Sequence, residues 1–236
     1  MFSTPFYKKA AAVFLGLSLA SAPVLADDLD VLGQFLQQNL TSDQDPLGTF
    51  LAENPDNMLE AQAAIAGPLL SSQAALIVNN RTGEVLYQKN MHRVMPIASI
   101  SKLMSAMVVL DARLNMNEVI TITEDEIDRL KGTGSRLSVG TQLTRAQLLH
   151  LSLMSSENRA THALGRTYPG GISAFVAAMN AKAQSLGMTN SRFYEPTGLD
   201  YRNVSTAWDL NKLAAAASNY APITKNSTAT YGSVYT

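Results

Sequence analysis

The sequence predicts an α/β fold of the α+β type, with an antiparallel sheet and a separate helical subdomain. The 236 residues are 46% hydrophobic and only 16% charged, which is enough to bury a core and excludes wholesale disorder. From residue 71 onward, apolar runs typical of strands come first and helical periodicities follow. The strand-like and helix-like segments show no βαβ alternation and no internal repeat, which favours the α+β class.

The first predicted element is a β-hairpin. Ala74–Val78 is a continuous apolar run, typical of a strand that is covered on both faces. Asn79–Gly83 has the composition of a turn, and Glu84–Tyr87 is apolar enough for a second strand. Because a lone hairpin is marginal in water, these strands need neighbours.

The helical subdomain is expected to begin after Pro96. Apolar residues recur there at i, i+3, i+4, i+7 and i+8, which predicts a largely buried helix through Ile100, Leu103, Met104, Met107 and Val108. A short strand is predicted at Val119–Thr123. Further helices are predicted from the capping residue Thr144 through Met154, over Asn158–Tyr168, over Ile172–Leu186 before Gly187, and from the cap Thr206 to Ser218. The tail, Ser218–Thr236, has no period and is expected to be a loop.

The N-terminus has the pattern of a secretory signal peptide over residues 1–26. Lys8 and Lys9 precede the apolar run Ala10–Ala20, and a small residue, Ala26, ends the segment. The apolar run is too short to span a bilayer, and the alternative is an ordinary buried helix. Residues 27–70 are predicted to be a partly helical extension or linker of unknown function. The sequence therefore predicts export, with a periplasmic location.

Composition excludes several kinds of chemistry. The net charge of −1 argues against a general nucleic-acid binder. The lack of cysteine excludes disulfides, thiolate zinc sites and a thiol nucleophile. The histidines, His92, His150 and His162, form no HxxxH pair, so we expect no metal site.

The helix after Pro96 carries a polar pair, Ser99 and Lys102. At three residues apart, the two side chains lie one turn apart on the same face, near the helix N-terminus. Desolvation lowers the pKa of a buried lysine, and a neutral amine beside a hydroxyl is a general base beside a nucleophile. The alternative is a lysine that reaches solvent from the helix end beside a serine cap, and roughly 0.7 such spacings are expected by chance.

A second candidate is Ser156-Glu157-Asn158, in the break between two predicted helices. A serine and an amide at such a break can reach a cleft, where the hydroxyl relays a proton and the amide binds a peptide group. The alternative is a helix cap.

The two segments 96–104 and 154–160 together resemble the penicillin-recognising serine enzymes. More narrowly, the chain is similar to the low-molecular-mass penicillin-binding proteins, and within them to D-alanyl-D-alanine endopeptidases of the penicillin-binding protein 7 type. The resemblance extends over about Gln73–Ser218. Further matches in order are Tyr168-Pro169-Gly170-Gly171, Leu186-Gly187-Met188, Glu195-Pro196-Thr197-Gly198-Leu199 and Val204-Ser205-Thr206-Ala207. Glu157 is a minor departure, because the family more often has aspartate there.

The resemblance implies an acyl-enzyme mechanism on peptidoglycan peptides in a β-lactamase-like transpeptidase fold. Ser99 would attack a D-alanyl carbonyl and Lys102 would accept its proton. Ser156 would pass a proton to the leaving amine, and Asn158 would bind the substrate. The resemblance also implies that β-lactams acylate Ser99 as inhibitors, and that neither a metal nor another cofactor is needed.

The family pattern further requires K-T-G or K-S-G on a later strand, and the sequence contains neither. Lys131-Gly132-Thr133 has the residues in another order, and Lys225-Asn226-Ser227 lacks the glycine. We therefore expect a chain that lacks its C-terminal strands, with 71–236 an incomplete D-Ala-D-Ala peptidase domain that labels poorly with penicillin. The alternative is a divergent protein that manages without those strands.

Three alternatives stay open. The catalytic residues do not separate an endopeptidase from a D,D-carboxypeptidase. A class A-like β-lactamase would need a glutamate that positions water. Glu195 is the nearest candidate, but it does not lie in an E-x-x-L-N loop, and its interpretation as a turn residue is favoured. A non-catalytic peptidoglycan-binding fragment is the alternative of another class.

Overall fold

The computed structural model describes residues 70–234. The predicted signal peptide, and the predicted linker except for its last residue, lie outside the described residues. The elements in order are β1 (Ala75–Val78), β2 (Val85–Lys89), β3 (Met95–Pro96), η1 (Ala98–Ile100), α4 (Ser101–Asp111), β4 (Val119–Thr121), η2 (Glu124–Glu126), β5 (Gln142–Thr144), α5 (Arg145–Met154), α6 (Asn158–Arg166), α7 (Gly171–Ser185), β6 (Val204–Ser205), α8 (Ala207–Ala217) and α9 (Ala221–Ser227).

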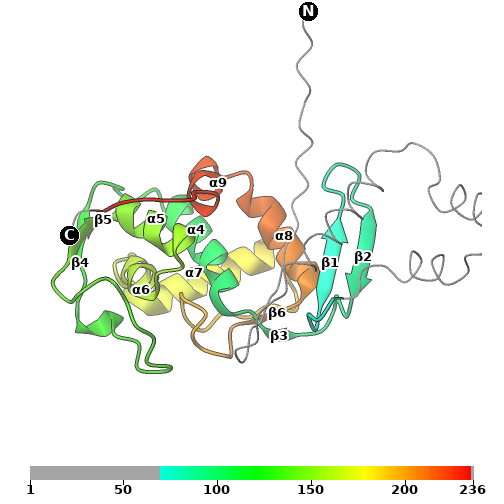
Figure 1. Cartoon of the computed structure of the whole chain (residues 1–236), viewed down its shortest axis with the longest axis horizontal. Helices are drawn as coiled ribbons and strands as arrows, with labels where there is room; N and C mark the ends of the chain where they lie inside the picture. The colour runs from blue at the N-terminus through cyan, green and yellow to red at the C-terminus, as the bar shows by residue number, and fades with distance from the viewer. Residues whose placement is uncertain (1–69, 235–236) are drawn as a thin grey trace, which may run out of the picture.

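The predicted hairpin is confirmed. β1 and β2 pair antiparallel, with Ala75 opposite Lys89 and an irregularity between Ile77 and Val78. The connecting turn closes with the amide of Gly83 donating to the Asn79 carbonyl, and Gly83 has φ +76°, where a side chain would be strained. The hairpin lies at one end of the molecule, beside α8 (Figure 1).

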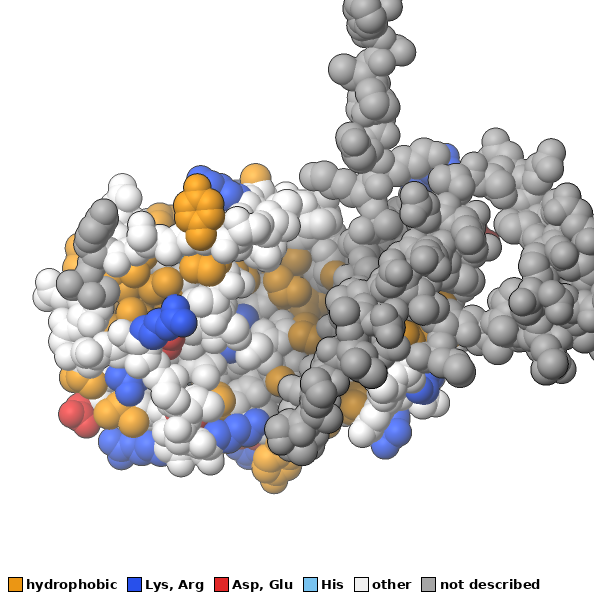
Figure 2. All heavy atoms as spheres, viewed as in Figure 1, with side chains coloured by type: hydrophobic (Ala, Val, Ile, Leu, Met, Phe, Trp, Pro, Cys, Tyr) orange, Lys and Arg blue, Asp and Glu red, His pale blue; other side chains and the backbone are white. Residues whose placement is uncertain are grey.

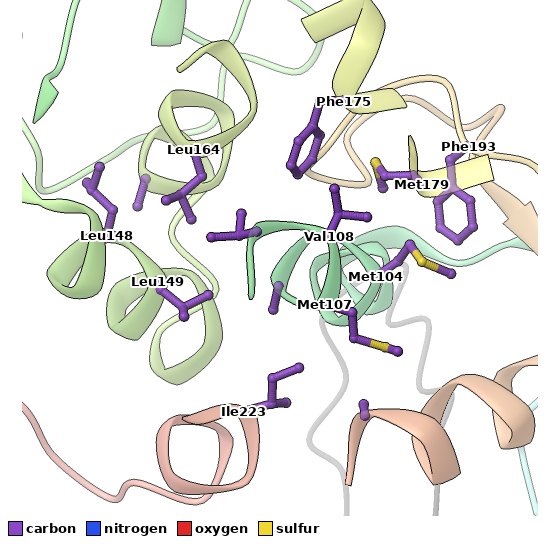
Figure 3. Packing of buried hydrophobic residues seen from close by; sticks show 14 of the residues in the cluster. Met104, Met107, Val108, Leu148, Leu149, Leu164, Phe175, Met179, Phe193 and Ile223 are labelled. Carbon is purple, nitrogen blue, oxygen red and sulfur yellow. The ribbon is translucent and has the colours of Figure 1, made fainter. Parts of the chain in front are cut away.

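The core of the helical region surrounds α4. Met104 and Met107 on this helix are fully buried, and the apolar side chains of the neighbouring helices converge on them (Figure 3). The labelled partners in Figure 3 include Leu148 and Leu149 from α5, Leu164 from α6, Phe175 and Met179 from α7, and Ile223 from α9. The predicted helix buried on most of its circumference is thereby confirmed.

The expected helix boundaries are confirmed to within a few residues. Thr144 forms a reciprocal capping box with Gln147 at the start of α5, and the Thr206 hydroxyl accepts the Asp209 amide at the start of α8. Gly187 follows α7 with φ +69°, as a C-terminal glycine should. The strand predicted at Val119–Thr123 is observed as β4, and it pairs with β5.

One prediction was wrong. The tail was expected to be a loop from Ser218, but it contains the helix α9, whose Ile223 is buried against the core. The helix has seven residues and offers only this one buried apolar side chain, so it gives no readable periodicity. A helix this short is marginal in isolation, and its packing on α5 stabilises it.

The described elements contain three separate two-stranded antiparallel ladders, β1–β2, β3–β6 and β4–β5. None of the helices within 70–234 is both long and apolar enough to cross a membrane. Figure 2 shows Lys and Arg side chains at several separate places on one face, not gathered into a single patch.

Candidate active site

Ser99 lies in the short helical turn η1, immediately before α4, and is exposed. Its neighbour Ala98 has φ +46°, an uncommon conformation for a residue with a side chain. The backbone of Gly198 packs directly on this turn, since a Cβ at Gly198 would lie 1.8 Å from the Ala98 carbonyl oxygen. Two segments about a hundred residues apart therefore fix the position of the hydroxyl.

Lys102 is the second residue of α4 and is only 2% exposed. Its Nζ has three oxygen neighbours: Ser99 Oγ at 2.9 Å, Asn158 Oδ1 at 2.8 Å and the Thr197 carbonyl at 2.9 Å. A charged ammonium can donate to all three. A neutral amine can donate to Asn158 and Thr197 and accept the proton of Ser99, so the same geometry suits a general base.

Burial lowers the pKa of Lys102 from its ordinary 10.5 to about 8, although Glu195 and Glu157 act in the opposite direction and raise it. With this pKa, about one lysine in ten is neutral at pH 7 and about half are neutral at pH 8. The expected lowering is found, with the charged form still predominant at neutral pH.

Asn158 is the first residue of α6, directly after the capping residue Glu157. Its side-chain oxygen faces Lys102, and its Nδ2 donates to Thr133 Oγ1 at 3.1 Å. The structure thus brings three predicted residues, Ser99, Lys102 and Asn158, into one hydrogen-bonded group.

Ser156 is not part of that group. It lies in the turn between α5 and α6 with φ +56° and is exposed. Among residues 70–234 its hydroxyl has no hydrogen-bond partner. Ser156 is therefore close to Asn158 in sequence but does not contact Ser99 or Lys102. Strained conformations of this kind are common at functional sites.

The loop after α7 supplies the Thr197 carbonyl. Ser105, one turn along α4 from Lys102, donates to the Pro196 carbonyl at 2.6 Å, so two successive turns of the helix hold the loop. Asn203 is fully buried, and its Nδ2 donates to Ser101 Oγ at 3.0 Å and to the Glu195 carbonyl at 2.9 Å.

The Glu195 carboxylate closes this loop. It accepts the amide and hydroxyl of Thr197, both at 2.6 Å, and the amide of Gly198. The interpretation of Glu195 as a turn residue therefore fits its contacts, and its charge also acts on Lys102.

A cavity of about 560 Å³ borders the group on the side of Asn158. Its lining includes Thr197, Leu199 and the polar side chains Glu126, Asp128, His162 and Arg166. Glu126 is buried and accepts hydrogen bonds from Arg166 Nε at 2.6 Å and from the Thr123 amide at 2.6 Å. In the described part of the chain, no three histidine, aspartate or glutamate side chains gather as a metal site would require.

Sequence reasoning missed Thr197 and Thr133. The Thr197 contribution is a backbone carbonyl, a group that every residue has, so no residue type could have indicated it. Thr133 belongs to the Lys131-Gly132-Thr133 segment, which the sequence presents only as the residues of K-T-G in another order. In the structure, Gly132 of this segment has φ +64°.

Comparisons with known proteins show which family this chain resembles. The D-alanyl-D-alanine carboxypeptidase family matches residues 60–235. Over 159 residues the chain is 52% identical to a D-alanyl-D-alanine endopeptidase of Pseudomonas aeruginosa, covering 67% of this chain and 51% of that protein. Over 168 residues it is 49% identical to the D-alanyl-D-alanine endopeptidase of Escherichia coli, covering 71% and 54%.

Comparison with solved structures finds a similar fold in a related enzyme. The structure of the Streptomyces K15 DD-transpeptidase matches with a TM-score of 0.63 and 29% identity, covering 67% of this chain and 65% of that one. The chain spans about half the length of the curated relatives that it matches. Since the family match extends over most of the sequence, the chain belongs to the D-alanyl-D-alanine carboxypeptidase family.

Proposed function

We propose that this chain carries the acylating residues of a serine D-alanyl-D-alanine endopeptidase, within a peptidase domain over 71–236. The observation that carries the proposal is the contact between the exposed Ser99 hydroxyl and the buried Lys102 amine, at 2.9 Å. Of the lysines within residues 70–234, Lys102 alone is buried, and its burial lowers the pKa to about 8.

The mechanism begins with the neutral form of Lys102. The amine takes the proton of Ser99 while Oγ forms a bond to the carbonyl carbon of a D-alanyl peptide. The resulting ammonium is held by the Asn158 and Thr197 oxygens, which already contact Nζ. The peptide C–N bond then breaks, and the amine leaves with the proton that Lys102 took from Ser99. The resemblance assigns the relay of this proton to the Ser156 hydroxyl, which would have to move toward Lys102, because the two are not in contact in this structure. Water hydrolyses the ester and restores Ser99.

The substrate class follows from the relatives. Two proteins about half identical to the matched region are named D-alanyl-D-alanine endopeptidases, which favours cleavage of peptidoglycan cross-links over removal of a terminal D-alanine. The signal-peptide pattern of residues 1–26 supports a periplasmic location, where such cross-links lie. β-Lactams are expected to acylate Ser99 as inhibitors.

The test is covalent attachment of benzylpenicillin to the full chain, followed by intact mass spectrometry. We expect an adduct equal to the mass of the whole penicillin, located at Ser99 by peptide mapping and absent in Ser99→Ala. Because the sequence lacks K-T-G or K-S-G, attachment is expected to be slow. A folded protein that binds sacculi equally well with and without the Ser99 hydroxyl, and forms no adduct, would contradict the proposal.

The reaction products separate the related activities. Release of monomers from a cross-linked muropeptide dimer indicates the endopeptidase, whereas release of free D-alanine from a pentapeptide indicates a carboxypeptidase. Rapid turnover of penicillin, without a long-lived adduct, would indicate a β-lactamase.

A further inference from the structure

A long loop connects η2 and β5, and the Asp128 carboxylate organises its first part, residues 128–133. Asp128 Oδ1 accepts the amides of Leu130 at 2.8 Å and Lys131 at 3.0 Å. Its Oδ2 accepts the amide of Thr133 at 2.9 Å and the Thr133 hydroxyl at 2.7 Å. Four hydrogen bonds from three residues therefore hold Thr133 against Asp128.

Because of this arrangement, Thr133 Oγ1 can only accept a hydrogen bond from its other neighbour, Asn158. A hydroxyl has a single proton, and an ionised carboxylate can only accept, so the Thr133 proton is used by Asp128. Thr133 Oγ1 must then act as an acceptor for Asn158, whose Nδ2 lies 3.1 Å away. With Nδ2 on this side, Asn158 Oδ1 points to Lys102 Nζ at 2.8 Å.

We propose that Asp128 and Thr133 are positioning residues, which fix the orientation of the Asn158 amide and thereby keep an oxygen, not an NH₂ group, against the Lys102 amine. The inference rests on the proposed function, because it assigns these residues to the reaction at Ser99. The inference explains why the Asp128–Thr133 segment, which lies outside the two catalytic segments 96–104 and 154–160, contacts the side chain of Asn158.

The physical consequence concerns the charged lysine. The two ends of a carboxamide have nearly the same shape, so their partners distinguish them: on one side an ammonium that can only donate, and on the other a hydroxyl that can only accept. If the amide turned over, its NH₂ would face the ammonium, and Lys102 would lose one of its three oxygen partners. The charged form would be stabilised less, and the pKa of Lys102 would fall. The other charged groups that act on Lys102, Glu195 and Glu157, are unchanged by this rotation.

The experiment compares Thr133→Val, which keeps the shape but removes the hydroxyl, with Thr133→Ser, which keeps the hydroxyl. Thr141→Val is the matched control, because the Thr141 hydroxyl makes no hydrogen bond in the described structure. The pKa of Lys102 is measured in the full chain by NMR titration of ¹³Cε-labelled lysine. The rate of benzylpenicillin attachment is measured at pH 9, where the wild-type amine is mostly neutral.

We expect Thr133→Val to lower the pKa of Lys102 by about half a unit or more and to slow attachment about tenfold, the effect of one hydrogen bond to a charged group. Thr133→Ser and Thr141→Val should resemble the wild type in both measurements. Asp128→Asn replaces one acceptor oxygen by a donor, and we expect it to lower the pKa of Lys102 in the same direction.

A pKa of Lys102 that is the same in Thr133→Val and in the wild type would overturn the inference, whatever the attachment rates. Equal loss in the serine and valine variants would also overturn it, because the hydroxyl would then not matter. Failure of the wild type to form any adduct would contradict the proposed function instead, and the NMR titration would still decide the role of Thr133.

Discussion

The helical region around α4 and the β1–β2 hairpin are built differently. α4 is enclosed by α5, α6, α7, α8 and α9, and its Met104 and Met107 are fully buried. The hairpin has two strands, and its own small cluster consists of Leu76 and Val78 packed against Ala207 of α8. Every residue of the hydrogen-bonded group, Ser99, Lys102 and Asn158, belongs to the helical side of this division (Figure 1).

The difference indicates which part of the molecule holds Lys102 and its oxygen partners in place. A buried amine keeps a lowered pKa only if its surroundings exclude water and hold fixed oxygen partners. The closed core around α4 provides this for Lys102, and the hairpin contributes no partner to its Nζ. We therefore expect substitutions in the helical region to change both stability and acylation, and substitutions in the hairpin to change stability alone.

The largest expected effect comes from matched lysine substitutions. Lys102→Met removes the general base and should reduce penicillin attachment about a thousandfold. Lys89→Met, in the hairpin, removes a lysine whose one side-chain hydrogen bond within residues 70–234 goes to the Leu70 carbonyl, at 2.6 Å, and should leave the attachment rate unchanged. The comparison is measured as the rate of adduct formation, and equal rates in the two variants would show that Lys102 is not the base.

A pair of glycine substitutions comes next. Gly198→Ala places a methyl group on the Ala98 carbonyl and requires φ +86°, so it should displace the Ser99 turn and slow attachment about a hundredfold. Gly83→Ala, in the hairpin turn, has open space around its Cβ, and should cost only about 1 kcal/mol of stability for its positive φ. Thermal unfolding and attachment rates are the measurements, and a normal rate in Gly198→Ala would contradict the described packing.

Core substitutions should produce smaller differences. Met107→Ala leaves a cavity in the closed core and should reduce the free energy of unfolding by about 2–5 kcal/mol. Leu76→Ala, in the small cluster of the hairpin, should cost about 2 kcal/mol, at the lower end of that range. Urea unfolding measures both. A larger loss at Leu76 than at Met107 would reverse the proposed division between the regions.

The last comparison is the acid sensitivity of the helical region. Burial would raise the pKa of Glu126, but hydrogen bonds from His162, Arg166 and Thr123 outweigh it and lower the pKa to about 2. Since this pKa lies below its usual value of 4.5, the stabilisation is complete above about pH 4.5 and is lost as the pH falls toward 2.

Glu126→Gln removes that titration and is the variant to compare. The wild type should lose stability more steeply than Glu126→Gln between about pH 4.5 and 2, measured by urea unfolding at each pH. Parallel curves would show that Glu126 does not titrate with a lowered pKa.

Much of the fold could be predicted because its signals are local. The cap at Thr144, the glycine at 187 and the apolar periodicity after Pro96 each depend on residues within a few positions of one another. The helix α9 could not be predicted, because Ile223 gains its stability from α5, which lies about seventy residues earlier.

The contacts of the candidate site are also of two kinds, local ones that could be predicted and long-range ones that could not. Ser99 and Lys102 share a helical turn, so their contact could be predicted from their spacing. The resemblance implied that Asn158 binds the substrate, and its contact with Lys102 was not predicted but is shown by the structure. Two features of the site could not be predicted from the sequence. The Thr197 carbonyl is a backbone group that every residue has, and the contact of Thr133 with Asn158 depends on the tertiary fold. The roles of Ser99, Lys102, Ser156 and Asn158 remain predictions of the mechanism.

The most direct test of the account is the pH dependence of penicillin attachment to Ser99. If the buried amine is the base, the rate should rise with pH, pass its midpoint at about 8 and then level off, because only the neutral form of Lys102 can accept the proton. A rate that does not change between pH 6 and 10, or an adduct on a residue other than Ser99, would contradict it.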